Sequence, residues 1–168
     1  MLEIINSRRS VRQWKNEQVS EEHIQKILEA AMNAPSAGNE QPWYFIVVKD
    51  KDLLVKASSI NLYGSFVKNA PVAILICADL RLERFKGYWV QDCSAAAQNL
   101  LLAAHSLGLG AVWTSIYPIE DRIKGCRQLF NLPEEIIPLT LIPIGYPLTA
   151  AGERKSRFDV SRVRQNSW

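Results

Sequence analysis

The sequence predicts a single domain that mixes helices and strands, and three observations support this. The chain has 168 residues, which suits one domain with a sizeable core. Apolar runs rich in β-branched and aromatic residues predict buried strands. Between these runs, apolar residues recur every three or four positions, which predicts amphipathic helices. The predicted strands lie within residues 33–48, 71–78, 111–115 and 136–145.

The composition narrows the class of protein. A net charge of +3 makes no strong case for nucleic acid, but it suits an anionic small ligand if the positive charges cluster. Cys77, Cys93 and Cys126 form no CxxC pair, so we expect neither a disulfide framework nor a metal site. No basic-then-apolar leader and no apolar run of about 18 residues is present, so we expect a cytoplasmic protein without a membrane partner.

The first distinctive segment is basic. Residues 1–6 predict a short helix, and the sequence SRRSVRQ follows at residues 7–13. Arg8, Arg9 and Arg12 stand within five positions, with Ser10 among them. Arginine forms forked hydrogen bonds to phosphate oxygens, and a serine hydroxyl adds a donor. The segment therefore predicts either a phosphate anchor or a solvated basic turn.

A helix is predicted to begin after Ser20. Serine is a good N-cap, and Glu21 and Glu22 follow at the positive end of the helix. His23 falls in the polar first turn, so we expect it to face solvent rather than to bind a ligand.

The segment NAPSAGNEQPWYFIVV at residues 33–48 connects this helix to the first strand. Small residues and Gly38, which tolerates a positive φ, allow something to approach the backbone closely. Asn39 and Gln41 each carry an amide donor and an amide acceptor, which could bond the edge of a flat heterocycle. The alternative is an ordinary helix-to-strand loop.

The middle of the chain continues the alternation. Residues 50–58 predict a short helix, and residues 71–78 predict the second strand. Residues 59–69 fit either a mobile loop or a helical turn over a ligand, and residues 79–86 are charged and predicted to be exposed.

Residues 88–107 form the longest helical pattern, and it is apolar almost all round. Such a helix is buried on more than one side, which in so small a protein indicates cover by a second subunit. His105 near its end is expected to cap or pack rather than to act in catalysis. The following Gly108-Leu109-Gly110 is no dinucleotide fingerprint, because it follows a helix and lacks the third glycine.

The last part of the chain predicts a strand, a helix over 119–130, a further strand and a tail. Thr114 and Ser115 end the strand at 111–115 and could offer polar contacts. Pro138 and Pro143 argue that they lie at the ends of the strand at 136–145, or that this strand is at an edge. The tail at 148–168 carries a second basic group, which comprises Arg154, Lys155 and Arg157.

Taken in order, these motifs resemble the flavin (FMN)-dependent nitroreductase family. The resemblance rests on the motifs RRSVR at 8–12, PSAGNEQPW at 35–43, QNLLLAA at 98–104 leading to GLG at 108–110, and GYP at 145–147, with KSR at 155–157 and the final NSW in the tail. It implies an α+β fold whose central, mostly antiparallel sheet is flanked by helices. It also implies one FMN-binding domain over 1–168 in an intertwined homodimer, with an extended C-terminal tail at 148–168 that wraps the partner subunit.

The resemblance assigns residues to the cofactor by position. Arginines and Ser10 would hold the FMN phosphate and ribityl chain, the 35–37 turn would come from the other subunit to the ring, and Thr114 and Ser115 would lie near flavin N5. Many relatives have glycines near Thr114 and Ser115, so this side of the implied flavin site departs from the family pattern. The cofactor-binding residues implied are Arg8, Arg9, Ser10, Arg12, Pro35, Ser36, Ala37, Asn39, Gln41, Asn61, Thr114, Ser115, Lys155 and Arg157. Candidates to line the substrate space, or alternatively core or interface aromatics, are Tyr63, Phe66, Tyr88 and Trp89.

The resemblance implies an FMN-dependent oxidoreductase. Hydride would pass in a ping-pong cycle from NADH or NADPH through flavin N5 to a nitroaromatic, quinone or similar small-molecule electron acceptor. Because the flavin carries the redox chemistry, no catalytic side chain is nominated. The alternatives are a flavin reductase or specialised reductive enzyme of the same fold, or a flavin-binding, redox-sensing protein with little turnover. A nucleic-acid binder is disfavoured, because the charge is modest and no aromatic platform adjoins the arginines.

Overall fold

A single antiparallel sheet forms the centre of the molecule. The computed structural model describes residues 1–149, 152 and 156–168. The strand order is β1 (Trp43–Val48), β2 (Val72–Asp79), β5 (Ile136–Gly145) and β3 (Gly110–Ala111), and β4 (Thr114–Ser115) also pairs with β5. Each of these pairings is antiparallel. The predicted α+β class with an antiparallel sheet is confirmed.

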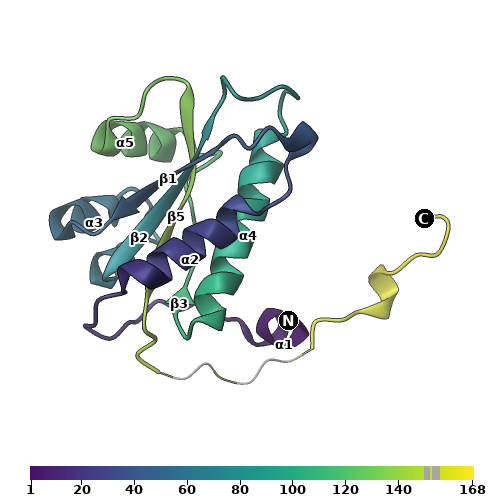
Figure 1. The fold of residues 1–168 in the computed structure, drawn as a ribbon, viewed down its shortest axis with the longest axis horizontal. Helices are drawn as coiled ribbons and strands as arrows, with labels where there is room; N and C mark the ends of the chain where they lie inside the picture. The colour runs from purple at the N-terminus through teal and green to yellow at the C-terminus, as the bar shows by residue number, and fades with distance from the viewer. Residues whose placement is uncertain (150–151, 153–155) are drawn as a thin grey trace.

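Helices cover both faces of the sheet (Figure 1). Helices α2 (Glu21–Met32) and α4 (Trp89–Ser106) pack on one face, and α3 (Lys51–Ala57) and α5 (Glu120–Phe130) pack on the other. A hydrophobic core lies on each face of the sheet, and the central strand β2 contributes to both. Ile74 and Ile76 face α2 and α4, whereas Leu75 and Cys77 face α3 and α5. This alternation explains why β2 reads as an unbroken apolar run.

The helix starts follow the capping signals. Ser20 Oγ accepts the His23 backbone N–H at 3.2 Å, and Asp50 Oδ1 accepts the Leu53 N–H at 2.8 Å. The short α1 (Leu2–Ser7) lies at the C-terminal end of α4, where Ser7 Oγ and His105 Nε2 are 2.8 Å apart. Short 3-10 helices among the described residues are η1 (Ala37–Asn39), η2 (Ser65–Asn69) and η3 (Val160–Arg162).

The prediction that Pro138 and Pro143 mark the ends of their strand, or an edge strand, is wrong. Strand β5 lies inside the sheet, and neither proline is its first or last residue. The β2–β5 register shifts beside Pro138, and such a bulge interrupts the ladder where the proline cannot donate. Pro143 lies opposite the break between β3 and β4, because the neighbouring Ile144 pairs with β3 and Leu141 pairs with β4.

The prediction of an exposed charged segment at 79–86 is wrong at its first residue. Asp79 is buried, and its carboxylate accepts hydrogen bonds from the Arg81 side chain at 2.9 and 2.7 Å. The hydrogen bonds from Arg81 hold the pKa of Asp79 below its ordinary value. Sequence inspection missed this pair because the two residues are both ordinary surface types.

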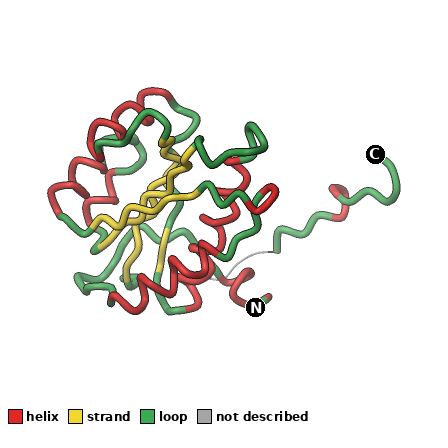
Figure 2. The backbone as a smooth tube through the Cα atoms, turned by 45° about the horizontal axis from the view of Figure 1, so that its top comes forward, coloured by secondary structure: helices red, strands yellow, loops and turns green. Residues whose placement is uncertain are grey.

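The C-terminal segment leaves the body of the protein. Residues 156–168 stretch away from the helices and the sheet, as both ribbon and tube show (Figures 1 and 2). Phe158 is 79% exposed and Trp168 is fully exposed. Within the described part of the chain, no helix combines the length and apolar character that a membrane crossing requires.

Candidate functional site

The basic segment is attached to the sheet beside β3. Ser10 forms an isolated parallel bridge with Ala111, and the Val11 N–H donates to the Ala111 carbonyl at 3.1 Å. The indole of the buried Trp14 donates from Nε1 to the Gly110 carbonyl at 2.8 Å. The backbone from Ser10 to Trp14 is thus held in place, and Arg12 between them is exposed.

The arginines of this segment differ in their surroundings. The Arg12 guanidinium lies over the Phe66 ring, 5.6 Å from its centroid, and Phe66 packs against Trp14. Arg9 folds back along its own chain, and its guanidinium donates to nearby backbone carbonyls at 3.2–3.4 Å. These acceptors belong to Asn6, Ser7, Arg8 and Gly152. Arg12 therefore has an exposed guanidinium for a ligand, whereas Arg9 braces the segment.

The pKa of His105 reflects its burial and the positive charge around residues 7–12, a region called the basic corner below. Its burial, and then the charges of Arg8 and Arg9, lower the pKa of His105 below its ordinary value. The same positive field that disfavours a protonated imidazole favours a bound anion. The donor set and the field at this corner both fit a phosphate group.

A second cluster of predicted residues, Asn61, Thr114 and Ser115, lies at strand β4 and is called the β4 wall. Asn61 Nδ2 and Arg122 Nη1 both donate to the Ser115 carbonyl, at 3.4 and 3.0 Å. Thr114 is buried, its hydroxyl donates to the Leu141 carbonyl, and the wall is therefore supported from the sheet. Arg122 was missed by sequence reasoning, since nothing in the pattern of α5 places its side chain beside β4.

The 35–41 loop has an unusual backbone. Gly38, Asn39 and Gln41 have φ values of 53°, 57° and 47°, in the left-handed region. Such conformations cost non-glycine residues about 1–3 kcal/mol and gather at functional sites. Ser36 Oγ accepts the Gln41 N–H at 3.0 Å, and Gln41 Nε2 donates to Asn39 Oδ1 at 2.9 Å. Both amide side chains are exposed at the tip, as a loop that contacts a ligand requires.

Two carboxylates beneath this loop were missed by sequence reasoning. Asp92 Oδ1 accepts the Ala37 N–H at 3.0 Å. Glu40 Oε2 accepts the N–H groups of Arg84 and Phe85 at 2.7 and 3.1 Å. The available signal was an aspartate in a helix that is otherwise apolar almost all round, because a buried carboxylate needs partners.

The structure keeps two groups of predicted site residues apart. The basic group, residues 8–12, lies towards the C-terminal end of α4, and the 35–41 loop lies at its N-terminal end (Figure 1). Thr114 and Ser115 pair with the middle of β5, and Asn61 lies beside Ser115. Asp92 touches the loop, and His105 touches Ser7 just before the basic group. A rise of about 1.5 Å per residue puts these two contact points about 20 Å apart along the helix.

The aromatic candidates have different fates. Tyr63 and Tyr88 are exposed, and the Tyr88 ring lies 6.3 Å from that of Phe85. Phe66 is half-buried beneath Arg12. Trp89 is buried in the core and packs edge-on against Tyr117 at 4.8 Å, so it belongs with the core aromatics and not with a substrate wall.

The basic residues of the tail remain apart from this arrangement. Arg157 is exposed in the extended segment. Lys155, which was predicted to join the phosphate, and its neighbour Arg154 lie outside the described residues.

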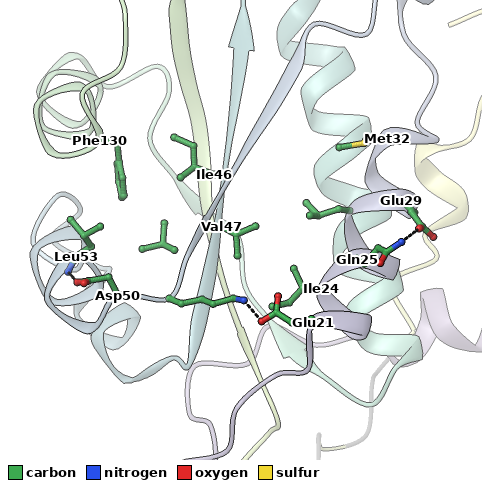
Figure 3. A pocket seen from close by; sticks show the side chains of 13 residues that line it. Glu21, Ile24, Gln25, Glu29, Met32, Ile46, Val47, Asp50, Leu53 and Phe130 are labelled. Carbon is green, nitrogen blue, oxygen red and sulfur yellow. Dashed lines mark hydrogen bonds and ion pairs between the residues drawn. The ribbon is translucent and has the colours of Figure 1, made fainter.

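A groove of about 840 Å³ lies between α2, the edge strand β1, α3 and Phe130 of α5 (Figure 3). Its floor is apolar, with Ile46 and Val47 of β1 between Ile24 and Leu53 of the flanking helices. None of the predicted cofactor-binding residues lines this groove.

Gly38 provides a test of the loop conformation. A Cβ at this position would lie 2.3 Å from Phe85 Cε2, and its φ of 53° disfavours alanine independently. We expect Gly38→Ala to displace Phe85 and to destabilise the fold by about 1–3 kcal/mol. Chemical denaturation measures this loss. Gly152→Ala, with open space around its Cβ, is the control, and equal stability of the two variants would contradict the loop geometry.

Comparisons with known proteins agree with this architecture. The model of the Nitroreductase family matches residues 5–62 and 55–146. A protein of Methanothermobacter thermautotrophicus, provisionally named NADH dehydrogenase/NAD(P)H nitroreductase, is 54% identical over 168 residues, which is all of this chain and 87% of that protein.

Two solved structures share the fold over nearly the whole chain. An FMN-dependent nitroreductase from Clostridium difficile R20291 superposes with a TM-score of 0.92 at 33% identity, and covers 100% of both chains. A provisionally assigned nitroreductase from Desulfovibrio desulfuricans, solved in complex with FMN, has a TM-score of 0.83 at 32% identity and covers 99% of this chain and 96% of its own. Because the family model matches most of the chain, and the relatives align over nearly its whole length with the same fold, the chain belongs to the nitroreductase family.

Proposed function

We propose that this protein is an FMN-dependent oxidoreductase that passes electrons from NADH or NADPH to nitroaromatic compounds, quinones or similar electron-poor acceptors. FMN is named for two of the similar structures, and NAD(P)H is named for the relative from Methanothermobacter. When bound, the flavin supplies the redox chemistry, since its ring accepts and donates hydride. The protein's task is to bind this ring, orient it and set its electrostatic surroundings.

The residues at the basic corner fit the phosphate of FMN. Arg8, Ser10 and Arg12 would hold it, with Arg9 bracing the segment and the tail residues Lys155 and Arg157 closing the cluster. After burial, the charges of Arg8 and Arg9 help to lower the pKa of His105, and this positive field supports the assignment. Hydrogen bonds to a charged group contribute about 1.5–3 kcal/mol each, so two or three of them anchor a cofactor well.

The remaining predicted residues would surround the ring. Asn61 and Ser115 would contribute the wall at strand β4, and Arg122 steadies it through the Ser115 carbonyl. Asn39 and Gln41 would bond the flavin edge or its ribityl chain from the tip of their loop. Tyr63, Phe66 and Tyr88 stay as candidates for the substrate space.

The observation that carries the proposal is the separation of the two groups of site residues. In one chain their contact points on α4, Asp92 and His105, lie about 20 Å apart, which supports a site that takes the loop from a second copy. We therefore propose a homodimer in which each cofactor lies between the basic group of one chain and the 35–41 loop of the other. Ala95, Leu102 and Ala103 of α4, which are only half-buried in the single chain, suit such an interface.

The tail has the properties of a segment that wraps a partner. Its apolar residues Phe158, Val160 and Trp168 are exposed in the single chain. The edge strand β1 has unpaired backbone groups on its outer side, and the apolar groove beside it suits an extended segment (Figure 3). We propose that the tail of a second copy covers this surface.

The first experiment is an absorption spectrum of the purified protein before and after anaerobic addition of NADH and then NADPH. We expect flavin bands that bleach with one nicotinamide, and light scattering at twice the chain mass. Steady-state rates with a nitroaromatic, a quinone and free FMN then separate the proposed activity from a flavin reductase. Flavin that binds without bleaching would overturn the proposal in favour of redox sensing, and no flavin after FMN addition would overturn it altogether.

A further inference from the structure

We propose that Glu40 and Asp92 form a buried acid pair that shares one proton and thereby positions the 35–41 loop. That the loop serves a flavin rests on the proposed function, but the pair itself does not. Both are positioning residues, since they act through the backbone of the loops and not on a ligand.

Burial and hydrogen bonding define the pair. Glu40 is 6% exposed and Asp92 is 4% exposed. In each side chain one oxygen is engaged: Asp92 Oδ1 accepts from Ala37, and Glu40 Oε2 accepts from Arg84 and Phe85.

The other oxygen of each carboxyl group has no such partner. Glu40 Oε1 and Asp92 Oδ2 are buried, and neither has a hydrogen-bond partner among the described residues. An unpaired buried carboxylate oxygen is costly, and two of them on interacting side chains are costlier still. One proton between them turns one carboxyl group into a donor and satisfies both oxygens.

The electrostatic surroundings favour this proton. Burial raises the pKa of Asp92, the Ala37 N–H opposes this, and the interactions with Glu40 and Glu83 raise it further. Glu83 belongs to the neighbouring loop and accepts the Gly87 N–H at 2.5 Å. None of the ion pairs among the described residues involves Glu40 or Asp92, and Arg84 approaches Glu40 through its backbone amide.

The pair joins three segments that are distant in the sequence. It connects the 35–41 loop, the segment at 83–88 and the first turn of α4, and Phe85 closes over Gly38 on the outside. Loss of the shared proton leaves two buried anions that interact where there is little water, and their repulsion pushes these segments apart. The conformation of the loop is therefore expected to depend on pH.

The direction of this dependence follows from linkage. A carboxyl group whose pKa is raised in the folded state stabilises the fold fully below its unfolded-state pKa, about 3.8 for Asp92. This contribution is lost as the pH rises through the folded-state pKa. The wild-type protein should thus lose stability, and its loop should loosen, as the pH rises from about 4 through the raised folded-state pKa of Asp92.

The test is Asp92→Asn in the full-length protein. The new amide can donate to Glu40 Oε1 while its oxygen keeps the Ala37 hydrogen bond, so it mimics the protonated pair at every pH. We measure the midpoint of thermal unfolding without added flavin from about pH 4 to pH 9. The unfolding midpoint of the variant, relative to that of the wild type, should rise by up to about 3–5 °C per pH unit within the titration range.

A matched control and a second variant make the test decisive. Glu17→Gln alters an exposed carboxylate and should follow the wild-type pH profile. Glu40→Gln can donate to Asp92 Oδ2 and should flatten the profile as Asp92→Asn does. Amide variants whose midpoints run parallel to the wild type at every pH would overturn the acid pair.

The two proposals fail separately. If the difference in unfolding midpoint between the amide variants and the wild type does not change with pH, the shared proton is ruled out, even if NADH bleaches a bound flavin. If that difference changes with pH as expected but the protein binds no flavin, the acid pair stands and the proposed oxidoreductase activity is ruled out.

Discussion

Gly110→Ala should detach the basic segment from the sheet and weaken both the fold and flavin binding. A Cβ at this position would lie 2.6 Å from Val11 Cβ and Cγ2 and 2.8 Å from Cγ1. Val11 cannot withdraw easily, because its N–H bonds the Ala111 carbonyl and Trp14 bonds the Gly110 carbonyl itself. Overpacking of this kind costs about 1–3 kcal/mol, which lowers the unfolding midpoint by about 2–12 °C.

The effect on flavin binding has a separate cause. Displacement of Val11 breaks the bridge between Ser10 and Ala111, and this bridge sets the direction in which Arg8 to Arg12 face. We expect weaker FMN retention in gel filtration in addition to the lower midpoint. Gly125→Ala in α5 is the matched control, since its Cβ would meet only Ile60 at 3.8 Å. Alanine inside a helix should stabilise that site by about 0.5–1 kcal/mol, and equal behaviour of the two variants would contradict the close approach.

Arg12→Gln should weaken FMN binding by about 10- to 100-fold and leave the fold nearly unchanged. The Arg12 side chain is exposed and its neighbour in the structure is the Phe66 ring, a contact that contributes about 0.5–1 kcal/mol at an exposed site. A hydrogen bond from this guanidinium to a phosphate contributes more, about 1.5–3 kcal/mol. Fluorescence titration of the apoprotein measures the affinity, and Lys124→Gln controls for the loss of one positive charge.

Riboflavin gives this prediction its chemical specificity. Riboflavin has the ring and ribityl chain of FMN but no phosphate. Arg12→Gln should therefore leave riboflavin binding close to the wild-type level. An equal loss for both flavins would show that Arg12 acts on the ring or on the fold, and would remove the phosphate assignment.

Mixing variants tests whether two chains build each site. Arg12→Gln impairs the basic group, and Gln41→Ala impairs the loop. In a randomly mixed population with shared sites, half the dimers carry one variant of each kind, and each of these has one intact site. About a quarter of all sites should then bind FMN normally. No recovery after mixing would mean that each chain builds its own site.

Predictions from the sequence were correct where the interacting groups lie close together along the chain. Ser20 and Asp50 cap α2 and α3 because a side-chain oxygen needs to reach only three residues ahead. The strands β1 and β2 follow from runs of residues that fit a pleated, buried surface. The same locality made the basic group at 8–12 and the polar tip of the 35–41 loop visible as candidate contacts.

The errors share a non-local cause. Whether Pro138 and Pro143 can lie in an interior strand depends on a register shift against β2 and on a gap between β3 and β4, which are distant in the sequence. The burial of Asp79 likewise depends on how the sheet is covered.

The sequence by itself determined the fold class, the positions of most helices and strands, and the residue types that suit a phosphate and a flat heterocycle. Only the tertiary structure decided that α4 separates these two groups and that the carboxyl groups of Glu40 and Asp92 are both buried at the 35–41 loop. Propensity and capping act over a few residues, so one sequence reveals them. The burial of these two carboxyl groups depends instead on how α4 packs against its neighbours, and that packing is a property of the whole chain.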